Sequence, residues 1–263
     1  MQFTIVMNKK YAYLLIGLVA LIIGLFKFAP ATLISQYIAD KTDNTVLLTN
    51  AQGTIWQGNA EISIKDEKSQ ELELGGIDWH IVASRLLLGE LSVIFHWNNS
   101  DSTTLTLTPT QLSIAKLNIN LPANVLSFIV PNLSAAQLGG QLRISTSSFN
   151  VTQLNMANLK PNFTGQIQLN WQLASSPLSP INPIGDYQAV LIGTDSLLMF
   201  KVNTLSGVLN LEGDGNINPA NGVVFSGLAS ADNSNKQALA PLLHVLGNEV
   251  VAGSGNFKIN FKH

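Results

Sequence analysis

The fold is decided by the stretch Phe163-Thr164-Gly165-Gln166-Ile167-Gln168-Leu169-Asn170-Trp171-Gln172-Leu173. Apolar residues and one glycine occupy every second position, and threonine, asparagine and glutamine stand between them. Successive side chains of a β-strand point to opposite faces of a sheet, so this period of two predicts one long strand. One face of the strand is apolar and the other is rich in amides. This is typical of an antiparallel sheet that is packed on one side and solvated on the other.

The same alternation recurs along the chain from about Thr45 onward. It is seen in Leu91–Trp97, in residues 105–114 and in residues 257–262. A series of such segments predicts an all-β dominated fold. No charge run or flexible linker divides them, so we expect one extended, curled antiparallel sheet, with residues 122–131 as the junction if it has two halves.

Two segments break the period of two and predict short helices. Residues 122–130 begin with Pro122, carry apolar residues on one helical face and are followed by Pro131 as a stop. Residues 234–246 have Ser234 as a candidate N-cap and leucines at helical spacing, and Pro241 is expected to kink this helix or to mark its true start. Each helix has one apolar face, so we expect each to plug an end of the sheet.

The N-terminal segment, residues 11–28, is apolar except for Lys27, and it follows Lys9 and Lys10. A helix of this length is about the minimum that crosses a membrane core of ~30 Å. The positive-inside rule then predicts a cytoplasmic N-terminus (residues 1–10), a transmembrane anchor (11–30) and a periplasmic β-rich domain (31–263). The alternative is a cleaved signal peptide with Ala29-Pro30-Ala31 as its cleavage site.

Composition excludes several classes of function. Charged residues make up 11% of the 263 residues and the net charge is −2, so there is no basic footprint for nucleic acid. The chain has no cysteine, which excludes disulfides, cysteine nucleophiles and cysteine-rich zinc sites.

Catalytic and metal-binding patterns are weak. Asp78 and His80 lie two apart on one strand face without a second ligand pair, so no metal site is predicted. Glu212 and Asp214 flank Gly213, where a turn is the default interpretation. No Gly-x-Ser-x-Gly motif occurs. We therefore expect no catalytic centre, no cofactor and no small-molecule substrate.

Gly53, Trp56 and Gly58 form the candidate structural or interaction motif, in the stretch Gly53-Thr54-Ile55-Trp56-Gln57-Gly58. Glycine tolerates bends and close backbone approach, and a buried tryptophan needs one partner for its N–H. We expect Trp56 to be buried over one end of the apolar sheet face. The competing hypothesis is an exposed binding hot spot for a partner.

These motifs, taken in order, resemble a known family. The chain resembles type II secretion system protein N in five segments. They are the apolar N-terminal segment, the Gly53 to Gly58 stretch, Ile77-Asp78-Trp79, Leu86-Leu87-Leu88-Gly89-Glu90-Leu91 and Leu178-Ser179-Pro180-Ile181-Asn182-Pro183-Ile184-Gly185-Asp186-Tyr187. The resemblance implies an accessory inner-membrane component of a Gram-negative secretion machine, with a scaffold or partner-binding role. It implies other secretion components and inner-membrane lipid as partners.

Two alternatives from other classes stay open. A sheet with one apolar face can cradle acyl chains, which predicts a periplasmic lipid-handling β-groove protein. A periplasmic glycan hydrolase is the third hypothesis, based on the Glu212 and Asp214 carboxylates.

Overall fold

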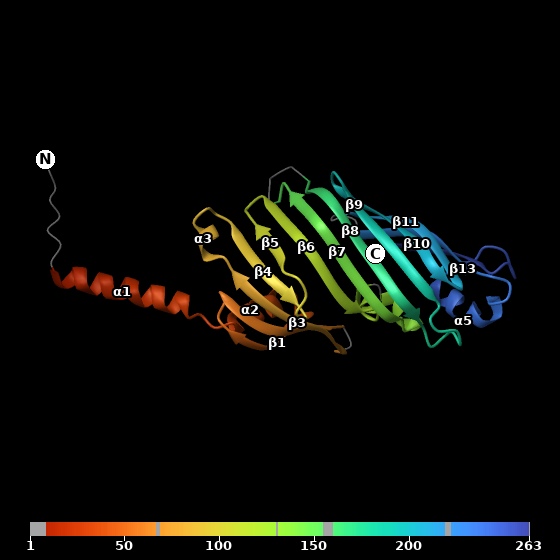
Figure 1. The fold of residues 1–263 in the computed structure, drawn as a ribbon, viewed down its shortest axis with the longest axis horizontal. Coiled ribbons are helices and arrows are strands. Elements are labelled where there is room, and N and C mark those ends of the chain that lie inside the picture. The colour runs from red at the N-terminus through yellow and green to blue at the C-terminus, as the bar shows by residue number, and fades with distance from the viewer. Residues whose placement is uncertain (1–8, 67–68, 130, 155–159, 219–221, 263) are drawn as a thin grey trace.

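The computed structural model describes residues 9–66, 69–129, 131–154, 160–218 and 222–262. These residues form one open antiparallel sheet with short helices, and the helix α1 projects from one end of the molecule (Figure 1). The predicted all-β dominated fold and the single extended sheet are confirmed.

The described part of the chain contains fourteen strands and six helical segments. The strands are β1 (Val46–Gly53), β2 (Gln57–Lys65), β3 (Glu71–Ile81), β4 (Leu91–Trp97), β5 (Thr103–Leu107), β6 (Gln111–Pro122), β7 (Gly139–Thr152), β8 (Asn162–Ser175), β9 (Gly185–Thr194), β10 (Leu197–Gly207), β11 (Leu209–Asn218), β12 (Gly222–Ala231), β13 (Asn248–Glu249) and β14 (Asn256–Lys262). The helices are α1 (Lys9–Lys27), α2 (Thr32–Lys41), α3 (Ala83–Leu86), α4 (Val125–Ile129), the 3-10 helix η1 (Pro131–Ala136) and α5 (Lys236–Leu246).

The sheet is a meander in which each strand from β1 to β12 pairs with the next one in the sequence. The order changes only at the C-terminal edge, where β14 pairs with β12 and β13 lies outside β14. Sequential strands can pair through short turns without long crossovers, so local connections suffice to build most of this sheet.

The register of β8 and β9 sorts side chains by face as the alternation predicts. Leu169 pairs with Ala189 on the apolar face, and Asn170 pairs with Gln188 on the other face. The Gln188 amide donates a 3.0 Å hydrogen bond to the Asn170 side-chain oxygen. The apolar face is the inner, concave one, because the helices pack on it.

Leu173 is an exception to the predicted pattern. The sequence places it on the apolar face, but its side chain is 62% exposed. The register between β8 and β9 shifts after Trp171, and Leu173 has a φ of 50°. A β-bulge adds one residue to a strand and reverses the facing of the residues beyond it, so the alternation ends there.

The two predicted helices are present with different boundaries. Residues 122–130 correspond to α4, but Pro122 ends β6, where it pairs with Gln141, and Pro131 begins η1 instead of ending the segment. Residue 130 lies outside the described residues. Tertiary pairing overrides the local signal for a helix start.

The second predicted helix, residues 234–246, is α5. Its N-cap is Asn235 rather than Ser234, and Pro241 lies inside the helix. The helices α2 and α3 were not in the predicted pair, so the expected number of two was wrong. Within the described residues, no helix combines the length and mean hydropathy that crossing a membrane requires.

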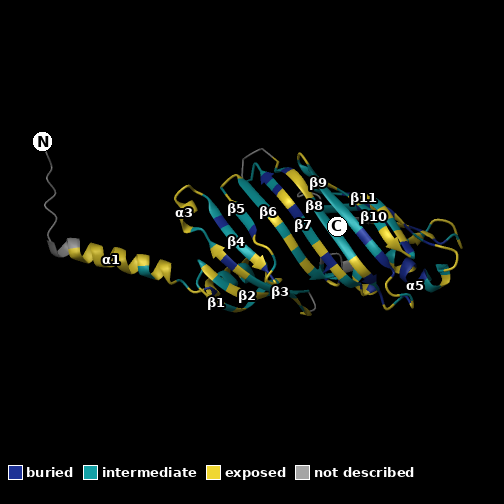
Figure 2. Ribbon diagram, in the orientation of Figure 1, coloured by how far each residue is buried: buried dark blue, intermediate teal, exposed yellow. Residues whose placement is uncertain are grey.

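The largest core cluster fills the C-terminal half of the sheet. Leu239, Leu242 and Leu243 of α5 are buried among inner-face residues of β9 to β14 and residues of η1. A second cluster packs α2 against β1 to β4 around Trp79. Figure 2 shows the contrast between buried residues in the sheet and the exposed α1. The helices thus pack on the inner face, whereas the sequence predicted that two of them would plug the ends of the sheet.

Glycines on the inner face make room for aromatic rings. Phe200 and Phe225 stack with ring centroids 5.8 Å apart and an interplanar angle of 5°. A Cβ on Gly213 would lie 2.6 Å from the Phe225 Cζ atom, and a Cβ on Gly215 would contact the Phe200 ring. The rings therefore lie over strand segments that have no side chain on this face.

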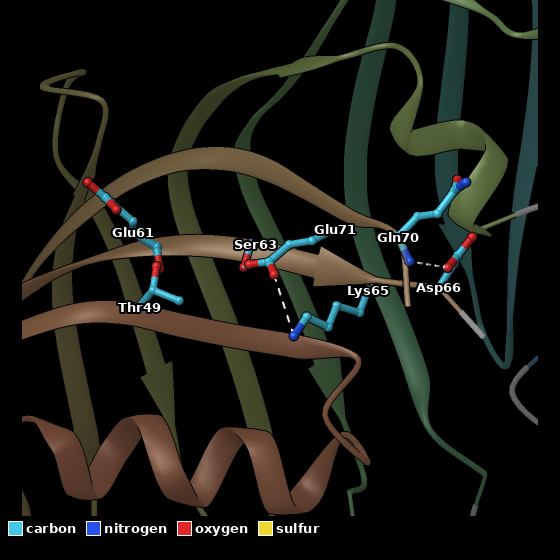
Figure 3. A network of polar contacts seen from close by, with 7 residues as sticks. All are labelled: Thr49, Glu61, Ser63, Lys65, Asp66, Gln70 and Glu71. Carbon is cyan, nitrogen blue, oxygen red and sulfur yellow. Dashed lines mark hydrogen bonds and ion pairs between the residues drawn. The ribbon is translucent and has the colours of Figure 1, made fainter. Parts of the chain in front are cut away.

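The outer face is polar, as Figure 3 shows for β1 to β3. The hydroxyl of Ser63 donates a 2.6 Å hydrogen bond to Glu71, and the Lys65 ammonium lies 3.4 Å from the same carboxylate. The hydrogen bond from Ser63 is the main cause that lowers the pKa of Glu71; burial opposes it, and the nearby Lys65 adds a smaller lowering effect. On the outer face, these polar contacts join the side chains of β2 and β3.

Candidate functional site

The predicted motif at residues 53–58 lies where α1 and α2 meet the edge of the sheet. The backbone N–H of Ile55 donates to the Ala29 carbonyl (2.9 Å), and that of Ala31 donates to the Gly53 carbonyl (3.1 Å). Pro30 and Thr54 form an isolated antiparallel bridge between these two bonds. The linker between the two helices is therefore tied to the turn between β1 and β2.

Both glycines of the motif are required by close backbone approach. Gly53 has a φ of +89°, and a Cβ there would lie 2.5 Å from the Gln57 carbonyl oxygen. A Cβ on Gly58 would lie 2.7 Å from a ring carbon of Trp79. A side chain at either position would force the turn or the tryptophan to move.

Trp56 contacts α1 instead of covering the apolar sheet face. Its indole N–H donates a 2.9 Å hydrogen bond to the carbonyl oxygen of Phe26, and the two rings meet edge to face with centroids 4.9 Å apart. The last carbonyls of a helix have no partner within the helix, so the indole satisfies one of them. Trp56 is only partly buried, which differs from the complete burial expected from the sequence.

Trp79 occupies the place that the sequence assigned to Trp56. It is buried in the cluster around β1 to β4, and its indole N–H donates to the Ile55 carbonyl (3.2 Å). The signal was present in the alternation of Ile77, Asp78 and Trp79, which puts Trp79 on the inner face. Two tryptophans therefore hold one turn, with Trp79 below it and Trp56 on the α1 side.

The weak catalytic candidates are not brought together. Asp78 and His80 lie on β3, and among the described residues no group of three metal-ligating side chains exists. Glu212 and Asp214 are exposed positions in the middle of β11, so the predicted glycine turn at this point was wrong. Gly213 and Gly215 lie in the strand, where the absence of a side chain makes room for the rings of Phe225 and Phe200.

The structure also forms an apolar cavity of about 510 Å³ between the inner face of the sheet and the helices α4, η1 and α5. Residues from the eight strands β7 to β14 line it, so the sheet must be curled around this space. Its lining includes Leu142, Trp171, Val202, Phe225 and Leu242. The sequence predicted the apolar face, but long-range curling decides whether a cavity forms.

The lining of the cavity differs in exposure from place to place, and it is exposed near the C-terminal end of α5. Leu142, Ile184 and Leu242 are fully buried in its wall, whereas His244 and Asn248 are exposed. The described residues that line it include no lysine, arginine, aspartate or glutamate.

Tyr187 is a buried polar group in the cavity wall. Its hydroxyl donates a 2.9 Å hydrogen bond to the Leu209 carbonyl. Burial, and to a lesser extent the nearby charge of Asp186, raises the pKa of Tyr187 far above its usual range. The hydroxyl therefore stays protonated and joins the start of β9 to the start of β11.

Comparison with known proteins relates this sheet to one family. The profile of the family described as Type II secretion system (T2SS), protein N matches residues 44–260. The chain belongs to this family. No curated protein and no solved structure matches the chain in the same comparisons.

The region shared with the protein N family is the sheet. The match begins directly after α2 and ends within β14, so it includes the Gly53 to Gly58 turn, Trp79 and the cavity. Phe26, the partner of Trp56, lies outside the matched region. The resemblance predicted from the ordered motifs is confirmed.

Proposed function

We propose that this chain is an inner-membrane-anchored periplasmic component of the type II secretion machinery that acts as a scaffold or partner-binding protein. The observation that carries the proposal is the match of the protein N family to residues 44–260, which is nearly the whole sheet. The family assigns the chain to type II secretion. The anchor, the compartment and the scaffold role are the finer parts of the proposal.

The anchoring part of the proposal places residues 1–10 in the cytoplasm, 11–30 in the membrane and 31–263 in the periplasm. Lys9 and Lys10 before the apolar segment support this orientation. The apolar side chains of α1 from Tyr13 onward are mostly exposed and have no cover from the sheet. Such a surface is stable in lipid and unfavourable in water.

A second apolar surface supports contact with inner-membrane lipid. Leu86 ends α3, and the next two residues, Leu87 and Leu88, are 90% and 71% exposed. Ile81, just before α3, donates its backbone N–H to the Trp56 carbonyl (2.7 Å), and Trp56 contacts Phe26 at the end of α1. The leucines are thus on the same end of the molecule as α1, where a bilayer would lie.

The scaffold part of the proposal follows from the shape and chemistry of the sheet. The sheet extends away from α1 and presents a polar outer face of amides and hydroxyls (Figure 1). The described residues contain no group of three or more side chains that could hold a metal ion. A long ordered surface of this kind suits binding of other secretion components.

The experiment exchanges the N-terminal segment of the full chain. In one variant residues 1–30 are replaced by a cleavable signal peptide, and in the control they are replaced by an unrelated single transmembrane segment. In a host strain that lacks its own copy, the control is expected to restore secretion and co-purification of secretion components, and the cleavable version is not. Full secretion by the cleavable version would contradict the anchor, and normal secretion without any copy would contradict the component role.

A further inference from the structure

The cavity behind α5 is not used by the proposed scaffold function. Protein interiors are close-packed, and voids larger than a water molecule are few. This cavity has about 510 Å³, which lies within the roughly 300–1,000 Å³ range of small-molecule sites. Its lining is exposed near His244 and Asn248, and we take this part as the mouth of the cavity.

We propose that this cavity binds one long alkyl chain of a fatty acid or membrane lipid, with the chain inside and the polar headgroup at the mouth. The buried part of the wall is made of apolar side chains, such as Leu142, Ile184, Leu209 and Leu242. An alkyl chain has no polar groups, so it loses nothing by leaving water and gains contacts along this wall.

The hydrogen-bonding groups of the wall favour an alkyl chain over a peptide. The Tyr187 hydroxyl already donates to the Leu209 carbonyl, and the Trp171 indole N–H donates to the Gly139 carbonyl (2.9 Å). A peptide segment would bring one N–H and one C=O per residue into this space, and leaving them unpaired is costly.

Two polar residues of the cavity lining lie at the mouth. His244 and Asn248 are exposed there, and the His244 ring packs edge to face on Phe257 with centroids 4.9 Å apart. Glu249 accepts a 2.9 Å hydrogen bond from the backbone N–H of Gly255 in the adjacent turn. A headgroup at this position stays in water, so the site needs no buried charge.

The test uses the full chain in living cells fed a palmitic acid that carries a diazirine and an alkyne. After irradiation, the chain is purified through the alkyne and digested, and mass spectrometry locates the adducts. We expect adducts on the inner-face residues of β9 and β10, far along the sheet from α1. The mass of each adduct distinguishes a free fatty acid from an intact phospholipid, and either result supports the proposal.

Ala189→Trp places a large side chain in the cavity, because Ala189 lies on the inner face between Leu169 and Val202. It is expected to lose the cavity adducts. The matched control is Val190→Trp, one residue on and on the outer face, which is expected to keep them. If Ala189→Trp does not accumulate, Val245→Trp narrows the mouth at a residue that is already 37% exposed.

Three outcomes overturn the proposal. The first is adducts confined to α1 or absent altogether. The second is cavity adducts that persist unchanged in Ala189→Trp or Val245→Trp. The third is a cross-link from a photoreactive residue at position 202 to another protein, which would show that a polypeptide occupies the cavity. None of these results depends on whether the chain acts in secretion.

Discussion

At the scale of single residues, two tryptophans near one turn have different roles. The Trp79 ring is buried inside the sheet cluster, whereas the Trp56 ring links the turn to α1. The partners lie far apart in the sequence, so residue type alone does not distinguish them.

Substitution of each tryptophan by alanine separates these roles. Trp79→Ala is expected to lower the free energy of unfolding by about 3–5 kcal/mol, as for other buried aromatic residues. Trp56→Ala removes one hydrogen bond worth about 0.5–1.5 kcal/mol and an aromatic contact of similar size. These bonds join α1 to the turn, so the melting temperature of the sheet is expected to change little.

Limited proteolysis measures the junction directly. Trp56→Ala is expected to speed cleavage between α1 and α2, and Trp56→Phe, which keeps a ring but lacks the N–H, is expected to be intermediate. Equal losses of melting temperature in Trp56→Ala and Trp79→Ala would show that Trp56 supports the sheet core after all.

Tyr187 predicts an alkaline limit to stability. Its pKa is raised in the folded state, so the unfolded chain ionises first as the pH rises. The stability that this shift contributes to the folded state is fully present below the ordinary tyrosine pKa of about 10 and is lost as the pH rises above it. Denaturant midpoints are therefore expected to fall above about pH 10.

Tyr187→Phe tests this assignment. It leaves the buried Leu209 carbonyl without its donor, which costs about 1–3 kcal/mol at neutral pH. The loss of stability at alkaline pH is expected to become shallower than in the wild type. Tyr37→Phe, at an exposed residue of α2, is the control. An unchanged alkaline slope in Tyr187→Phe would assign the effect to other groups.

At the scale of elements, the C-terminal strands depend on glycines that face the core. Gly213 lies below Phe225 and close to the Gly227 backbone, where a Cβ would lie 2.7 Å from the Gly227 Cα atom. At Gly213 and Gly215, the inner-face positions of β11 therefore carry no side chain, which leaves room for the aromatic rings.

Gly213→Ala is expected to lower the free energy of unfolding by about 1–3 kcal/mol, because overpacking displaces the Phe225 ring. The control is Asp214→Ala, at the next residue of β11 and on the outer face, where a change within about 0.5 kcal/mol is expected. Chemical denaturation of both variants measures the difference. Similar values for the two would mean that the ring shifts without cost.

At the scale of the whole molecule, α1 and the cavity lie toward opposite ends of one curled sheet (Figure 1). The sheet joins them without a break in strand pairing from β1 to β12. The α1 end and the cavity are therefore connected through continuous backbone hydrogen bonding.

The proposed topology predicts the accessibility of single cysteines, which this cysteine-free chain allows without background. Asn233→Cys, at an exposed loop before α5, is expected to react with an impermeant maleimide in intact spheroplasts. Gln2→Cys is expected to react only after lysis. The reverse pattern would contradict the orientation, and loss of the N-terminal residues from the mature protein would support the signal-peptide alternative.

The sequence by itself determined that the chain is mostly β-strand and that the sheet has one apolar and one polar face. A period of two in residues 163–171 depends only on the alternating direction of neighbouring side chains, so it could be read without knowing the partners. The same reasoning separated the apolar side chains of β8 from its amides, but it assigned to Trp56 the buried position that Trp79 occupies. The ordered motifs were also sufficient to predict the family.

Only the tertiary structure decided the partners and the cavity. Leu173 turns outward because of a register shift against β9, and Trp56 meets Phe26, thirty residues earlier. The cavity exists because β7 to β14 curl together beneath α5, which brings Leu142 and Leu242 to one wall. These features depend on the summed twist and packing of distant strands, and no local pattern in the chain encodes them separately.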